Sequence, residues 1–81
     1  MFYTERRYYT TYPNIEITFK SFENFGKAVK YVKRYAGGHR FDSVEMTDED
    51  DNVILWIYNS GGGTEINKEL WDKYSGGNAW D

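Results

Sequence analysis

The residues best able to do chemistry in this sequence are acids in its middle, in the stretch EMTDEDDNVILWIYN. Carboxylate oxygens are the ligands that Ca²⁺ prefers. An EF-hand loop that began at Asp48 would, however, need glycine where Val53 stands and glutamate where Asn59 stands. We therefore predict no metal site. The acids are either a solvated turn between two strands or a source of negative potential that meets a basic partner, and the second is our working hypothesis. The candidate contacts are Glu45, Asp48, Glu49, Asp50 and Asp51.

A second candidate group is basic and belongs to the first half of the chain. Its members are Arg6, Arg7, Lys27, Lys30, Tyr31 and Arg34. Lysine and arginine neutralise phosphates and tyrosine stacks on bases, which are the two requirements for binding single-stranded nucleic acid. No RRM, KH or cold-shock signature accompanies them. The group supports a nucleic-acid-binding function as the alternative hypothesis.

The charges are divided between the two halves of the sequence. Residues 1–40 carry eight basic and three acidic side chains, and residues 41–81 carry two basic and ten acidic ones, within a net charge of −3. Such polarity either holds the two halves together or presents surfaces of opposite sign to partners.

Catalysis has little support in the residue types. The chain has no cysteine, no GxSxG elbow and a single histidine, His39, which follows a glycine pair and adjoins an arginine. The loop SGGGTE has glycines at Gly61, Gly62 and Gly63, but it lacks the P-loop lysine and the spacing of a dinucleotide fingerprint. We predict a protein that is not an enzyme and takes no cofactor.

The elements that position these residues begin with a hairpin. Strand formers run from Met1 to Thr11, Pro13-Asn14 supplies a turn, and Ile15, Ile17 and Phe19 then alternate with polar residues as in a half-buried strand. Ser21 is expected to cap a helix over residues 22–36, which places Phe22, Phe25, Val29, Val32 and Ala36 on its buried stripe and the basic residues outside.

Two strands and a second helix follow. Residues 41–47 predict a third strand, and the apolar residues 53–58 predict a central fourth strand. Thr64 is expected to cap a helix to about Tyr74, and residues 77–81 form a loose tail. The sequence predicts one domain over residues 1–81, of class α+β: a two-layer ββαββα fold with an antiparallel sheet and helices on one face.

The composition of the chain also limits its expected cellular location and function. No apolar run is long enough to span a bilayer, and a cysteine-free chain without a leader suits the cytoplasm. In size, in its ββαββα order and in its tyrosine-rich, cysteine-free composition, the chain resembles small phage-encoded inhibitors of host defence, including anti-CRISPR proteins. This resemblance implies an inhibitor in the host cytoplasm whose acidic surface blocks the nucleic-acid site of a target protein. The chain is expected to be a monomer or, through aromatic residues of its first strand, a homodimer.

Overall fold

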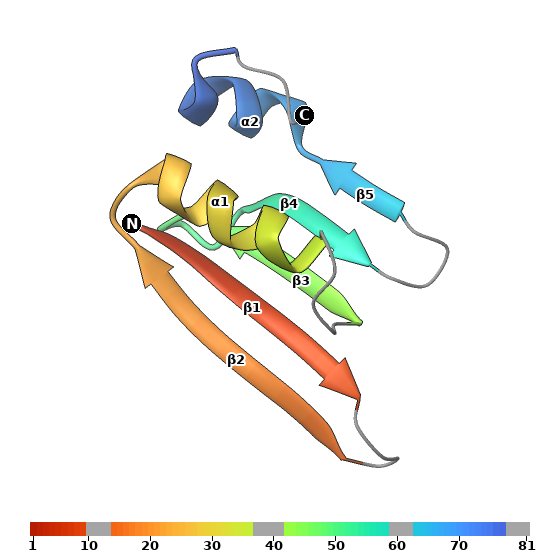
Figure 1. Cartoon of the computed structure of the whole chain (residues 1–81). Helices are drawn as coiled ribbons and strands as arrows, with labels where there is room; N and C mark the ends of the chain where they lie inside the picture. The colour runs from red at the N-terminus through yellow and green to blue at the C-terminus, as the bar shows by residue number, and fades with distance from the viewer. Residues whose placement is uncertain (10–13, 37–41, 59–62, 78–81) are drawn as a thin grey trace.

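A five-stranded sheet forms one layer of the molecule and two helices form the other, as the computed structural model shows (Figure 1). The structure describes residues 1–9, 14–36, 42–58 and 63–77, apart from the side chains of Tyr9, Tyr35 and Ala36. The element order is ββαβββα, so the predicted α+β class, with an antiparallel sheet, is confirmed.

The sheet has the strand order β2-β1-β3-β4-β5, and every neighbouring pair is antiparallel. Its strands are β1 (Phe2–Tyr9), β2 (Ile15–Phe22), β3 (Ser43–Thr47), β4 (Val53–Tyr58) and β5 (Gly63–Ile66). β1 and β2 form a long hairpin whose far end extends beyond the helices (Figure 1). β4 has a neighbour on each side, which confirms it as an interior strand. Ile54, Leu55 and Ile57 are buried, whereas Val53 and Trp56 are 42% and 40% exposed, so only part of its apolar run lies in the core.

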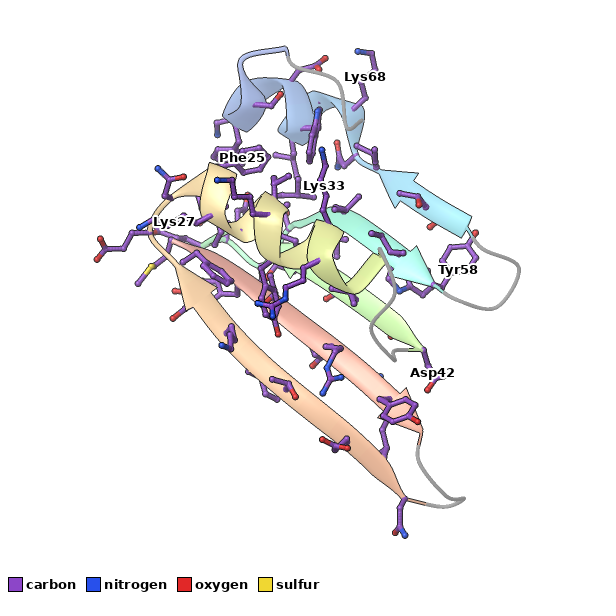
Figure 2. The ribbon with its side chains drawn as sticks, in the orientation of Figure 1. Phe25, Lys27, Lys33, Asp42, Tyr58 and Lys68 are labelled. Carbon is purple, nitrogen blue, oxygen red and sulfur yellow. The ribbon has the colours of Figure 1, made fainter. Side chains whose placement is uncertain are left out.

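The helices are α1 (Phe25–Ala36), which packs on β1, β2 and β3, and α2 (Lys68–Ser75), which packs on β4 and on α1. Between them and the sheet lie the buried core residues: Ala28, Val32, Val44, Met46, Ile54, Leu55, Ile57 and Trp71. Aromatic rings close the end of this core. Phe25 points from the first turn of α1 toward α2 (Figure 2), and its ring centroid lies 5.2 Å from that of Trp71 and 5.3 Å from that of Phe2.

Both helices begin later than the sequence predicts. β2 continues through Phe22, and Asn24 accepts a hydrogen bond from the backbone N–H of Lys27, so Asn24 rather than Ser21 opens α1. The residues around Thr64 form β5, and Asn67 caps α2 by accepting a hydrogen bond from the N–H of Leu70. The extra strand pairs with β4 in the tertiary structure, which is why its local sequence alone did not predict it.

The largest departure from the sequence prediction concerns the faces of β2. The apolar residues Ile15, Ile17 and Phe19 were expected on a half-buried face, yet they are 38%, 44% and 70% exposed. Phe22 instead places the other face of β2 toward the helices, because it lies under α1 with its ring centroid 5.3 Å from that of Tyr31. Side chains alternate along a strand, so all three apolar residues then point to the face that the helices leave uncovered.

Within the described residues, neither helix is both long enough and apolar enough to cross a membrane. The predicted tail and loop residues His39, Phe41, Gly61 and Gly62, together with residues 78–81, lie outside the described part of the chain.

Candidate partner-binding surface

The sheet face opposite the helices presents side chains in ordered cross-strand rows. In one row the Cα partners are Phe19 of β2, Glu5 of β1, Glu45 of β3, Trp56 of β4 and Glu65 of β5. Directly opposite residues share a face and lie about 5 Å apart. This register therefore places three carboxylates and two large aromatic rings in one line across the sheet.

Aromatic side chains on this face are accessible. Phe19 is 70%, Tyr3 43% and Trp56 40% exposed, and the ring of Trp56 lies 5.1 Å from that of Tyr58. Large rings that keep this much apolar area in water are the side chains that most often anchor a protein interface. They give the face a source of binding energy in addition to charge.

Glu45 lies at the centre of the carboxylate row. It faces Glu5 directly across the β1–β3 pair, and three surface hollows share it as a wall. Partial burial raises the pKa of Glu45, and the negative charges of Glu5 and Asp51 raise it further. The Arg7 guanidinium acts against this shift of the Glu45 pKa, and its Nε lies 2.9 Å from Glu5 Oε2.

The loop between β3 and β4 adds further acids beside this row. Glu49 and Asp51 line the same hollow as Tyr3, Glu5, Phe19 and Glu45. Asp50 is exposed on the same loop. We call the combined surface the acidic face; its members are Tyr3, Glu5, Phe19, Glu45, Glu49, Asp50, Asp51, Trp56 and Glu65.

Asp48 has a different role from the other acids of the loop. It is only 4% exposed, and its Oδ1 accepts hydrogen bonds from the backbone N–H groups of Asp50 and Asn52, at 3.0 and 2.9 Å. The hydroxyl of Tyr74 donates to Oδ2 at 3.2 Å. The bonds from Asn52, Tyr74 and Asp50 lower the pKa of Asp48, although burial opposes them. Asp48 therefore shapes the loop and ties it to α2, and it displays almost no surface to a partner.

Some of the remaining loop acids form the turn, and others are exposed on the surface. Asp51 has a φ of 66°, in the left-handed region that Asp tolerates better than most residues, and its N–H donates to the Asp48 carbonyl. Glu49 Oε1 lies 2.6 Å from the amino group of Met1. Turn geometry thus accounts for Asp48 and Asp51, while the side chains of Glu49, Asp50 and Asp51 remain exposed.

The predicted basic group is split by the fold. Arg7 lies on the acidic face, whereas Arg6 points to the helix side, where its Nη2 donates to Thr18 Oγ1 at 3.1 Å. Tyr31 is half-buried against Phe22. The basic residues that α1 exposes are Lys27, Lys30, Lys33 and Arg34. The described basic surface is thus one helix, opposite the acidic face, with no exposed tyrosine among the four.

The described residues contain no group of three or more acidic, histidine or cysteine side chains arranged to hold a metal ion. Comparisons of the chain with protein-family models, curated proteins and solved structures give no match.

Sequence reasoning missed several members of the acidic face. Glu5 and Glu65 were scattered single acids in the sequence, and only the sheet register aligns them with Glu45. The exposed Phe19 was taken for a core residue of β2. A signal for it did exist, because Phe22 has the opposite parity from Ile15, Ile17 and Phe19, and both sets could not face the core.

Proposed function

We propose that this protein is a small non-enzymatic binding module whose acidic face docks on the basic, nucleic-acid-binding surface of another protein and blocks it. The observation that carries the proposal is the row that combines Glu5, Glu45 and Glu65 with the exposed rings of Phe19 and Trp56 on an uncovered sheet face. Its carboxylates would take the place of phosphates on the target. This function is of the kind implied by the resemblance to phage-encoded inhibitors.

The charges on the face favour a protein partner over nucleic acid. Exposed aromatics on an antiparallel sheet are also how many RNA-binding domains stack bases. Here, however, Arg7 is the only basic side chain that the described strands place among the face's acids, and its guanidinium already contacts Glu5. Phosphates would be repelled by the surrounding carboxylates, whereas lysine and arginine side chains of a protein would be attracted.

A specific complex would cover a modest share of the protein's surface. A standard protein–protein interface uses about 800 Å² of each partner, whereas the whole chain exposes 5532 Å². Phe19 and Trp56 would anchor the interface, and the exposed loop acids would steer association and make it sensitive to salt.

The proposal is tested by capturing partners from a lysate of the host cell, because the target is expected to be a cytoplasmic protein. Immobilised wild-type protein is expected to retain a nucleic-acid-binding protein that an added oligonucleotide displaces. The double variant Glu5→Lys, Glu45→Lys is expected to retain none of it. A retained protein that oligonucleotides do not displace, or that the double variant holds equally well, contradicts the proposal.

The matched control reverses charge on the other side of the molecule. Lys27→Glu combined with Lys30→Glu changes the same number of charges on exposed positions of α1 and is expected to leave capture unchanged. Asp48 is left intact in every variant, because its substitution would disturb the loop itself.

The alternative function, direct binding of single-stranded nucleic acid, depends on the exposed basic residues of α1. It predicts that a labelled oligonucleotide binds at low salt, that affinity falls steeply as salt rises, and that the α1 double variant abolishes binding. Fluorescence anisotropy of the wild-type protein and the α1 double variant measures this directly. Binding that survives the α1 substitutions excludes α1 as the nucleic-acid site.

A further inference from the structure

The outer edge of β2 is the longest exposed strand edge in the described structure. β2 has eight residues and pairs with β1 on one side only, and no other described strand adjoins it. The opposite edge strand, β5, has four residues. A long edge presents a row of backbone N–H and C=O groups that can pair with another strand, and proteins commonly shorten, bend or cover such edges.

The side chains of β2 are complementary to a second copy of the same strand. If two β2 strands run antiparallel with Thr18 opposite Thr18, each Glu16 lies opposite the Lys20 of the other copy. The same register places Ile17 opposite Phe19. Every residue then pairs with one on the same face, because the paired positions have the same parity. Shifting the axis to Ile17 or to Phe19 loses the pairing of Glu16 with Lys20.

We propose that the protein forms a two-fold symmetric homodimer through β2, with the axis at Thr18, which joins the two sheets into one of ten strands. Glu16 and Lys20 lie on the helix side and make two equivalent cross-strand ion pairs. Ile17 and Phe19, 44% and 70% exposed, cover each other on the opposite side. A self-complementary patch of this kind is what an isologous two-fold interface requires.

The helices leave room for this arrangement. α1 packs on β1, with β2 and β3 on either side of it. In the joined sheet the two β1 strands would be three strand spacings, about 14 Å, apart. Helices pack at separations of about 8–10 Å, so both copies of α1 fit over the joined sheet. The proposal does not depend on the proposed function. Of the acidic face it covers only Phe19, at the β2 end of the row, and it leaves Glu5, Glu45 and Trp56 uncovered on both copies.

Charge reversal tests the register. Sedimentation velocity of the full chain from about 1 μM to 1 mM is expected to show a monomer–dimer equilibrium. Glu16→Lys and Lys20→Glu, each alone, set like charges opposite each other twice and are expected to raise the dissociation constant by about tenfold or more. The double variant with both substitutions restores two opposite-charge pairs and is expected to dimerise like the wild type. Glu69→Lys, on the exposed surface of α2, is the matched control and is expected to change nothing.

A cysteine placed on the axis tests the same register independently of charge. Thr18→Cys would bring two cysteines together at a Cα separation of about 4.5–5.5 Å, within the range that a disulfide spans. The chain has no other cysteine, so oxidation is expected to link this variant into a dimer. Thr64→Cys, an exposed position on β5, is the matched control and is expected to remain largely unlinked.

The outcomes are distinct. A protein that remains monomeric across the concentration range overturns the proposal, as does a dimer that neither single reversal weakens. A double reversal that leaves the dimer as weak as the single ones, with circular dichroism showing a native fold, overturns the proposed axis. The proposed axis is also overturned if Thr18→Cys cross-links no faster than Thr64→Cys.

Discussion

Replacing Glu45 with glutamine is expected to stabilise the fold and weaken partner binding at the same time. Glu45 is half-buried and lies directly opposite Glu5 in the β1–β3 register. Like charges in directly opposite positions are destabilising, by roughly 0.2–1 kcal/mol for a cross-strand pair. Arg7 offsets part of this repulsion because its Nε contacts Glu5 at 2.9 Å. We therefore expect a gain of about 0.5 kcal/mol for Glu45→Gln at pH 7, or about 2–4 °C in Tm for a domain of this size.

The stabilising effect of Glu45→Gln is expected to depend on pH. The pKa of Glu45 is raised in the folded state, so the carboxylate destabilises the protein at every pH above that raised value. As pH falls through the raised pKa toward about 4.3, the pKa of an unperturbed glutamate, the native state takes up a proton and the penalty disappears. The advantage of Glu45→Gln is therefore expected to be greatest near neutrality and to vanish by about pH 4.

Thermal unfolding followed by circular dichroism at several pH values measures the effect. Glu65→Gln is the matched control, because Glu65 lies on the same face but opposite Trp56 rather than a carboxylate. Its effect on stability is expected to stay within about 0.5 kcal/mol. A lower Tm for Glu45→Gln at pH 7, or a difference that is the same at pH 4 and pH 7, would refute the reasoning. If Glu45→Gln raises Tm and also weakens partner binding, the weaker binding is not caused by unfolding.

Three further predictions concern the elements that hold the acidic face in place. Asp48→Asn is expected to lower Tm at pH 7, and the deficit should shrink below about pH 3.9, because the lowered pKa of Asp48 stabilises the fold only while the group is ionised; melts over pH 2–7 measure this. Gly63→Ala is expected to cost about 1 kcal/mol in urea unfolding, since the new Cβ would meet the Tyr58 ring and force that side chain to shift; an unchanged midpoint contradicts this contact. Asn67→Ala is expected to cost about 1 kcal/mol by removing the cap of α2, and Asn67→Asp should restore most of it; an unchanged midpoint for Asn67→Ala contradicts the capping role.

Local patterns of apolar and polar residues predict much of the fold. The alternation of Val44 and Met46 with Ser43 and Glu45 correctly predicts which side of β3 is buried. Val32 is buried on the inner face of α1, and Phe25 and Val29 pack against the same core, as the predicted helical stripe indicated. Both patterns repeat with the period of their element, so a single residue's environment follows from its neighbours. Short β5 carries no such pattern, and three of its four residues are exposed.

The candidate site was predicted less completely. The loop acids were recognisable as a cluster, but their roles were not, because one of them, Asp48, is buried and accepts a hydrogen bond from a tyrosine 26 residues further along the chain. Lys27, Lys30 and Arg34 are exposed on α1 as predicted. Arg6 and Arg7 were grouped as neighbours, although adjacent residues on a strand point to opposite faces.

The sequence by itself determined the first four strands, the amphipathic first helix and the overall α+β class, because hydrophobic periodicity is a local property. Tertiary structure decided which side of β2 meets the helices. Phe22 and the set Ile15, Ile17 and Phe19 compete for the core, and the contact of Phe22 with Tyr31 of α1 shows which set lies inside. It also decided where the acids lie, since Glu5, Glu45 and Glu65 are 40 and 20 residues apart in sequence and enter one cross-strand row only through antiparallel register. Register is a long-range property that no local window contains.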